Sequence, residues 1–229
     1  MPDQFNDKQI VAQYAADLVE NGMTVGLGTG STANYFIEAL AKRKQQGLEV
    51  TTVSSSIVSM VKAQSLDLNV ISIEQLQSLD LYVDGADEVT DELYLLKGRG
   101  SDLVREKLLA TASKQMIVMV DKTKLVDRIG EKFAIPIEVM PFSWQLAKQN
   151  IELLGGSGEL RANASGDGLA VTSHGSLVLD MQFDVDTDIT ALDKQLSSVP
   201  GVVEHGIFIG LASTVLIAEQ GKVEVRSNK

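Results

Sequence analysis

The segment 26–33, Gly-Leu-Gly-Thr-Gly-Ser-Thr-Ala, has the residue types of an anion-binding turn. It lies between an expected strand at 23–26 and an expected helix at 31–44, where unbonded N–H groups and the positive end of the helix dipole favour a negative charge. Hydroxyl side chains in the turn add donors without adding charge. We predict that the turn binds a phosphate group, the alternative being a tight turn without a ligand. The hydroxyl donors of the turn are Thr29, Ser31 and Thr32, and its glycines let the backbone approach an anion closely.

The same segment matches the G-x-G-x-x-A fingerprint of dinucleotide-binding proteins through Gly28, Gly30 and Ala33. Such proteins carry an acidic residue near the end of the next strand, where it binds the ribose. Here the next expected strand, 50–53, runs into three serines at 54–56. A mononucleotide P-loop is excluded because no Gly-Lys-Ser/Thr follows the glycines. The sequence therefore gives little support to a nucleotide site.

Three carboxylates, Asp84, Asp87 and Glu88, follow an expected buried strand at 81–83. Crowded carboxylates raise one another's pKa values, so such a cluster at a strand end favours a functional site. A solvated capping loop and a divalent metal site are the alternatives, since hard cations take oxygen ligands. The two histidines of the chain lie far downstream and give no support to a transition-metal site.

A cationic glycine loop, Lys97-Gly98-Arg99-Gly100, leads into an expected helix capped by Ser101 or Asp102. The helical spacing of Val104 and Leu108 predicts the buried face of this helix. Glu106 then lies roughly 200° from Val104, at about 100° per residue, so we expect it away from that buried face.

These residues need a framework of strands that brings them together. Short apolar strands, separated by helices or loops, are expected at 23–26, 50–53, 70–73, 81–83 and 116–120. This alternation predicts a mostly parallel sheet covered by helices on both faces. Ligands bind such sheets at the carboxyl ends of the strands. We therefore expect the glycine turn, the acidic cluster and Lys124 at the same edge of the sheet.

A second, smaller unit is expected to begin near residue 129. Its strands are predicted at 135–139, 159–162, 178–183 and 202–203, and its helices at 144–154 and 190–198. The order strand-helix-strand-strand-helix-strand is that of a ferredoxin-like α+β domain. Strand-like segments at 207–211, 215–218 and 223–225 are expected to return to the first sheet. We predict an α/β chain with a Rossmann-like domain at 1–128 plus 207–229 and a ferredoxin-like domain at 129–206.

The composition excludes several classes of function. The chain has 229 residues with 20 Lys+Arg against 31 Asp+Glu, a net charge of −11. So acidic a protein lacks the basic surface that nucleic acids and anionic membranes require. Without cysteine it can have no disulfides, thiolate catalysis or iron–sulfur clusters. A polar start and the lack of an 18-residue apolar segment favour a cytoplasmic protein.

Four segments together resemble the ribose-5-phosphate isomerase A family, in its order and approximate spacing. They are Gly28–Thr32, Tyr82–Glu88, Lys97-Gly98-x-Gly100 with Arg105–Lys107, and Pro200–Val203. The resemblance covers nearly the whole chain. It implies a two-domain α/β subunit, a homodimer or higher homo-oligomer, and interconversion of D-ribose 5-phosphate and D-ribulose 5-phosphate in the pentose phosphate pathway, with no metal and no cofactor.

The resemblance also assigns roles by position. Glu106 is expected to accept the substrate proton, with Asp84, Asp87 and Lys97 as further catalytic residues. The turn at 29–32 is expected to hold the phosphate. The residues expected to line the sugar are Asp84, Gly85, Ala86, Asp87, Lys97, Gly98, Arg99 and Gly100, with Lys124 and Lys8 as further substrate contacts.

The chain departs from the family pattern at two positions. Arg99 replaces a glycine, which removes easy access to positive φ and adds a bulky cation. Ile57 stands where an acidic residue is common. Neither change removes a residue with an assigned chemical role, so both bear on affinity more than on the reaction.

Three other functions share parts of this pattern. An amino-sugar-phosphate isomerase or deaminase would use the same anion turn and a carboxylate base. A non-catalytic sugar-phosphate sensor would need the turn but would have no reason to keep Asp84, Asp87, Lys97 and Glu106 together. A metal-dependent phosphohydrolase would use the carboxylates as metal ligands, and EDTA insensitivity would count against it.

Overall fold

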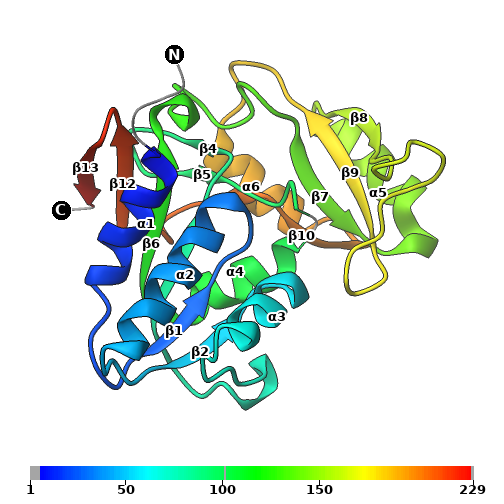
Figure 1. The fold of residues 1–229 in the computed structure, drawn as a ribbon. Helices are drawn as coiled ribbons and strands as arrows, with labels where there is room; N and C mark the ends of the chain where they lie inside the picture. Colours follow the sequence, from blue (N-terminus) through cyan, green and yellow to red (C-terminus); the bar gives the residue numbers. More distant parts are fainter. Residues whose placement is uncertain (1–5, 101, 228–229) are drawn as a thin grey trace. The chain divides into compact units, whose positions relative to one another are not determined.

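A computed structural model describes residues 6–100 and 102–227, which form two compact units (Figure 1). The first unit consists of Met1–Ala86, Arg105–Leu125 and Gly210–Lys229. The second consists of Asp87–Val104 and Val126–Ile209. The domains expected from the sequence, 1–128 plus 207–229 and 129–206, differ mainly in the segment 87–104, which packs within the second unit.

The first unit is built on a six-stranded sheet of order β13-β12-β6-β3-β1-β2. All neighbouring strands are parallel except β12 and β13, which confirms the predicted mostly parallel sheet. The strands are β1 (Thr24–Leu27), β2 (Thr51–Ser54), β3 (Leu79–Gly85), β6 (Ser113–Asp121), β12 (Thr214–Glu219) and β13 (Lys222–Ser227). The tail segments 215–218 and 223–225 join this sheet, as predicted.

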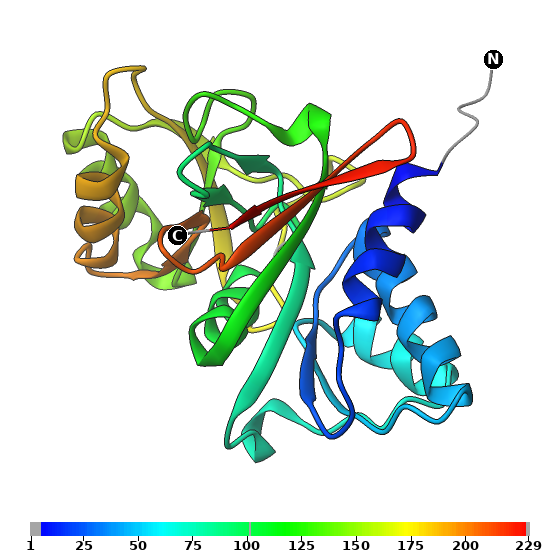
Figure 2. The ribbon, with the colours of Figure 1, turned by 90° about the vertical axis from the view of Figure 1, so that its left-hand side faces the viewer.

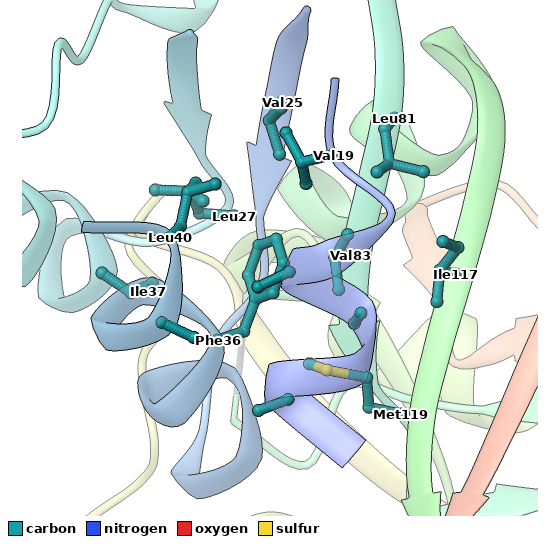
Figure 3. Packing of buried hydrophobic residues seen from close by; sticks show 14 of the residues in the cluster. Val19, Val25, Leu27, Phe36, Ile37, Leu40, Leu81, Val83, Ile117 and Met119 are labelled. Carbon is teal, nitrogen blue, oxygen red and sulfur yellow. The ribbon is translucent and has the colours of Figure 1, made fainter. Parts of the chain in front are cut away.

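Helices cover this sheet on both faces, also as predicted. Figure 2 shows α1 (Asp7–Asp17) and α2 (Ser31–Gln45) side by side on one face, while α4 (Leu103–Ala112) lies on the other. The apolar core beneath α1 and α2 joins residues such as Phe36 and Leu40 to Val83 and Ile117 of the strands (Figure 3). Ser101, one of the two predicted caps of α4, lies outside the described residues.

The expected strand at 70–73 is wrong. Val70 forms only an isolated parallel bridge with Thr52, and a 3-10 turn covers Ile73–Gln75. Ser72 and Gln75 form a capping box that turns the chain here instead of extending it. The helix that precedes this segment, α3 (Ile57–Ser65), begins three residues after the end of β2 and is capped by Ser56.

The strand order places a topological switch point between β1 and β3. From β1 the chain goes to β2 on one side, and from β2 it crosses over to β3 on the other side of β1. Ligands of doubly wound sheets bind outside the carboxyl ends of the strands at such a point. The anion turn follows β1 and Asp84 ends β3, so both lie at this point.

The second unit contains a four-stranded antiparallel sheet of order β10-β7-β9-β8. In chain order this is 4-1-3-2, with one helix after the first strand and one after the third, which is the predicted split βαβ arrangement. The elements are β7 (Ile135–Val139), α5 (Trp144–Leu153), β8 (Ser157–Leu160), β9 (Leu177–Gln182), α6 (Ile189–Ser197) and β10 (Val202–His205).

A three-stranded sheet of order β11-β5-β4 completes the second unit. It consists of β4 (Glu88–Val89), β5 (Leu95–Leu96) and β11 (Ile207–Phe208). The expectation that 207–211 returns to the first sheet is therefore wrong, because Ile207 and Phe208 pair with β5. Among residues 6–100 and 102–227, no helix is long and apolar enough to cross a membrane.

Candidate active site

The predicted anion turn leads directly into α2. Gly30 is the N-cap residue and has φ 114°, a conformation that favours glycine. Gly30 and Ser31 are exposed, whereas Thr29 and Thr32 are half-buried. The first amides of a 15-residue helix therefore open to solvent at the turn. Lys8 of α1 donates to Ser31 Oγ at 2.9 Å, which adds a cation beside these amides.

A cluster of buried hydroxyls braces the turn from behind. Thr29 Oγ1 lies 2.9 Å from Ser55 Oγ and donates to Ser56 Oγ at 2.7 Å. Ser59 Oγ donates to the carbonyl of Gly28 at 2.7 Å. The serines after β2, which replace the acidic residue of a nucleotide site, thus hold the turn in place. From their positions in the sequence, Ser54–Ser56 predicted only the lack of a ribose contact, because the bracing depends on the pairing of β1 with β2.

Asp84 is bound to the turn. Its side chain is fully buried at the end of β3, where Oδ1 accepts hydrogen bonds from the amides of Thr29 at 3.0 Å and Gly85 at 2.7 Å. Oδ2 accepts from the Tyr82 hydroxyl at 2.5 Å. A Cβ atom on Gly28 would lie 2.0 Å from Asp84 Oδ1. Gly28 is therefore required to make room for the carboxylate, a role that the sequence did not reveal.

Glu106 is buried on α4, with 4% of its surface exposed. The predicted buried face of this helix is wrong, because Leu108 is 53% exposed while Leu103 and Leu109 are fully buried. Glu106 lies three residues from each of these two leucines and so shares their face. Its charge acts on Tyr82: burial, then Asp84, then Glu106 raise the pKa of the Tyr82 hydroxyl well above its ordinary value.

Lys97 and Asp87 belong to the second unit, where the small sheet holds them. The Asp87 amide donates to the Leu96 carbonyl at 2.8 Å, and the Lys97 amide donates to the Gly206 carbonyl at 2.9 Å. Lys97 is 3% exposed, and its Nζ lies 5.8 Å from the centre of the Phe208 ring. A Cβ on Gly206 would lie 2.3 Å from the Lys97 carbonyl oxygen, so this close approach needs glycine.

The loop after Lys97 accommodates Arg99 without strain. The non-glycine residues with positive φ in the described chain are Asp67, Leu93 and Gln220. Arg99 therefore has an ordinary backbone conformation, while Gly98 takes φ 94°. The Arg99 guanidinium lies 4.0 Å from the centre of the Phe133 ring, and its Nη1 lies 3.8 Å from Asp87 Oδ1.

Arg161, which follows β8, clamps this loop. Its Nη1 donates to the carbonyls of Gly98 and Arg99, each at 3.1 Å. Its other guanidinium nitrogens make a two-pronged ion pair with Asp180, at 2.8 and 2.5 Å. Such a fork fixes both distance and plane. Nothing in the sequence around Arg161 pointed to this role.

Glu88, the third acid of the predicted cluster, stabilises a loop of the second unit. It is fully buried, and its carboxylate accepts hydrogen bonds from the amides of Gly130, Lys132 and Phe133 at 2.6 to 2.8 Å. It therefore fixes the loop that precedes β7. Within residues 6–100 and 102–227, no group of three or more His, Asp or Glu is arranged to hold a metal ion.

Lys124 lies in the 3-10 turn Lys122–Lys124 that follows β6, and it is half-buried. Asp121 caps this turn by accepting from the Thr123 amide at 2.9 Å. Strand β6 is parallel to β3. Lys124 is therefore at the same edge of the sheet as Asp84, as expected from the sequence.

Fold and site together define a Rossmann-like α/β protein with a glycine turn at a helix N-terminus and a buried carboxylate, both at its switch point. The family model for ribose 5-phosphate isomerase A (phosphoriboisomerase A) matches residues 51–222. The chain belongs to the ribose 5-phosphate isomerase A family. A second model, for the DeoR C terminal sensor domain, matches residues 3–76, which include the anion turn.

Individual relatives agree with this assignment over nearly full length. The ribose-5-phosphate isomerase A of Gloeobacter violaceus is 41% identical over 220 residues, 95% of this chain and 94% of that protein. The ribose 5-phosphate isomerase A structure from Methanocaldococcus jannaschii is 33% identical, covers 97% of this chain and 99% of its own, and superimposes with a TM-score of 0.92. A D-ribose-5-phosphate isomerase structure in complex with phospho-erythronic acid is 34% identical. It covers 97% of this chain and 98% of its own chain, and superimposes with a TM-score of 0.93.

Proposed function

We propose a residue-level mechanism for the reaction of this family. The chain interconverts D-ribose 5-phosphate and D-ribulose 5-phosphate, an aldose–ketose isomerisation of the pentose phosphate pathway (EC 5.3.1.6). The observation that carries the mechanism is the 3.0 Å hydrogen bond from the Thr29 amide to Asp84 Oδ1. This bond connects the turn at residues 29–32, where the phosphate would bind, to the buried Asp84 carboxylate, which would bind the sugar.

Glu106 is the base in this mechanism. Isomerisation requires removal of a proton next to a carbonyl, which is slow unless a base is positioned. The Glu106 carboxylate takes the C2 proton of the open aldose and returns it to C1. Its burial on α4 supports this role, because a buried carboxylate has few solvent contacts to lose when it acts as a base. A positioned base contributes about 10² to 10⁴-fold.

Lys97 stabilises the enediolate oxygen, and Asp84 and Asp87 bind the sugar hydroxyls. An ammonium group held in a buried position can stabilise the developing oxyanion without reorganising. Asp84 and Asp87 hydrogen-bond the sugar hydroxyls, assist ring opening and move the proton between O1 and O2. Gly85, Ala86, Gly98, Arg99 and Gly100 line the sugar.

Phosphate binding fixes the position of the sugar. The substrate is an anion and the chain carries a net charge of −11, so attraction has to be local. The amides and hydroxyls of residues 29–32 supply it, aided by Lys8 at the turn and by Lys124. The 2.9 Å hydrogen bond from Lys8 to Ser31 Oγ supports the role of Lys8 in phosphate binding.

The decisive assay follows metal-free protein and ribose 5-phosphate in D₂O by NMR. We expect ketose formation and C–H exchange, both unaffected by EDTA. Glu106→Gln should lower kcat by at least about 10²-fold with folding unchanged. The control Glu152→Gln changes an acid of α5 that pairs with Lys148 at 2.8 Å, and it should retain full activity. A Glu106→Gln enzyme within a few-fold of the original would contradict the assignment of the base.

A sugar-phosphate sensor is the second candidate function. The match of residues 3–76 to the DeoR C terminal sensor domain supports it, because these residues include the anion turn and its serine bracing. Saturable binding of ribose 5-phosphate without ketose formation in the NMR assay would favour the sensor. Conversion would rule it out as the sole function.

We also propose a homodimer or higher homo-oligomer and a cytoplasmic location, both expected from the family resemblance and composition. Light scattering coupled to gel filtration tests the first, and fractionation of cells producing the tagged chain tests the second. We further expect the chain to bind phospho-erythronic acid, as in the solved relative. Its carboxylate presents two oxygens as the enediolate does, so it should compete with ribose 5-phosphate.

A further inference from the structure

The hydroxyl of Tyr82 is a polar group buried in the middle of the first unit. Its side chain has no exposed surface, and the hydroxyl donates to Asp84 Oδ2 at 2.5 Å. Strand β1 makes room for the ring: Gly26 is in register with Tyr82, and a Cβ there would lie 2.7 Å from the Tyr82 ring. A phenylalanine would fill the same space, so packing alone does not explain the hydroxyl.

Asp84 also connects Tyr82 to the anion turn. The Thr29 amide donates to Asp84 Oδ1 at 3.0 Å, while the Tyr82 hydroxyl donates to Asp84 Oδ2. Thr29 is itself fixed by its side chain, because Oγ1 donates to Ser56 Oγ at 2.7 Å. Thr29, Asp84 and Tyr82 therefore form a chain of hydrogen bonds, in which the turn holds one carboxylate oxygen and Tyr82 holds the other.

The Tyr82 hydroxyl keeps its proton and donates a hydrogen bond to Asp84. Burial and the charges of Asp84 and Glu106 raise the pKa of Tyr82 well above its ordinary value, so the hydroxyl keeps its proton at the pH of metabolism. A hydrogen bond to a carboxylate is among the stronger ones in proteins, and its loss leaves a buried oxygen undersatisfied.

We propose that Tyr82 is a positioning residue of the isomerisation, which fixes the Asp84 carboxylate relative to the phosphate bound at residues 29–32. The inference rests on the proposed role of Asp84. The turn fixes one end of the substrate and Asp84 meets its hydroxyls, so the hydrogen bonds on the two Asp84 oxygens set the distance between these two substrate contacts. Misplacing such a contact by about 1 Å can cost about 10²-fold in rate.

Tyr82→Phe tests the inference, with Tyr14→Phe as the matched control on the exposed side of α1. Tyr14 is 40% exposed, so its variant should behave as the original enzyme. For Tyr82→Phe we expect kcat lower by about 10- to 100-fold and KM for ribose 5-phosphate within about threefold, because the phosphate contacts remain. Unchanged kcat in folded Tyr82→Phe would overturn the inference.

A double-mutant cycle separates positioning from mere structural support. If Tyr82 acts through Asp84, adding Tyr82→Phe to Asp84→Asn should lower kcat by less than about twofold further. Fully multiplicative effects would contradict action through Asp84. Should Tyr82→Phe fail to fold, Gly26→Ala displaces the Tyr82 ring instead, because its Cβ would lie 2.7 Å from that ring; a several-fold fall in kcat supports the proposal and an unchanged kcat overturns it. An inactive original protein would refute the proposed function itself, which distinguishes the two failures.

Discussion

The two units position their candidate residues by different means. In the first unit, Thr29 and Asp84 come from the ends of adjacent parallel strands, and their contact follows from strand register. In the second unit, Asp87 and Lys97 flank two-residue strands, which are too short to fix these residues by themselves. The Arg161 side chain and the backbone contact between Lys97 and Gly206 supply the additional support. A regular sheet thus needs few special residues to build a site, whereas an irregular loop needs several supports.

This difference predicts different responses to mutation. The hydrogen bond between the Thr29 amide and Asp84 depends only on how β1 and β3 pair. A substitution that displaces Asp84 should therefore remove this contact completely. Lys97, in the loop of the second unit, is held in two independent ways. Its amide donates to the Gly206 carbonyl, and Arg161 donates to the carbonyls of the two residues that follow Lys97. Loss of one support should therefore reduce function without abolishing it.

Gly28→Ala gives the largest expected effect. Its Cβ would lie 2.0 Å from Asp84 Oδ1, so the carboxylate has to leave its place beside the Thr29 amide. We expect kcat/KM to fall by at least about 10³-fold, combining lost positioning with lost electrostatic stabilisation. Steady-state kinetics on ribose 5-phosphate measure the change.

Gly47→Ala is the control for Gly28→Ala. Gly47 has φ 104° and nothing within 4 Å of its Cβ position, so alanine there strains the backbone after α2 without touching the site. It should lower the melting temperature but keep kcat/KM. If Gly28→Ala lost stability to the same degree and kept its activity, the close packing of Asp84 on Gly28 would not matter for the reaction.

Local patterns in the sequence were sufficient for the parts of the site that lie at strand ends. The glycine turn and Asp84 each follow an apolar strand, and parallel strands end at one edge. The role of Gly28 was not predictable, because it depends on the register that sets Gly28 beside Asp84, fifty-six residues away in the chain. For the same reason the pairing of 207–208 with β5 was missed.

The face of α4 was mispredicted for a different physical reason. Apolar residues occur all around this helix, so hydrophobic spacing allows more than one buried face, and Leu108 is left exposed. The face that packs inward carries Glu106, a residue that spacing rules would place in solvent. A buried carboxylate on a helix is a departure from local rules, which is where functional groups are often found.

Arg161→Lys tests the loop supports and should have an intermediate effect. Lysine keeps the charge but loses the fork that joins Asp180 to the two loop carbonyls. We expect kcat to fall about 5- to 20-fold, because Lys97 keeps its backbone bond to Gly206. Arg226→Lys changes a pair with Glu224 on the edge strand β13 and serves as the control. A loss as large as that of Gly28→Ala would contradict the idea of independent supports.

Glu138→Gln should give the smallest effect, on stability rather than on rate. Glu138 is buried on β7, and burial raises the pKa of its carboxyl above the ordinary 4.5, although hydrogen bonds from Thr172 and Ser176 and the charge of His174 oppose the shift. The charge of Asp102 adds to it. The unfolded chain therefore releases this proton first, and stability is lost as the pH rises from about 4.5 towards the folded-state pKa.

Glutamine mimics the protonated acid and can still accept the 2.9 Å hydrogen bond from Thr172. Relative to the original protein, Glu138→Gln should thus gain stability as the pH rises above about 4.5, where the unfolded chain loses its proton first. Urea unfolding at several pH values measures the difference, and Glu152→Gln, which removes an acid paired with Lys148, should not gain stability as the pH rises. A constant difference between the two proteins from pH 4 to 7 would mean that Glu138 titrates alike in both states. The second unit would then hold a buried acid without cost to its stability, whereas the first unit holds Asp84 through hydrogen bonds on both carboxylate oxygens.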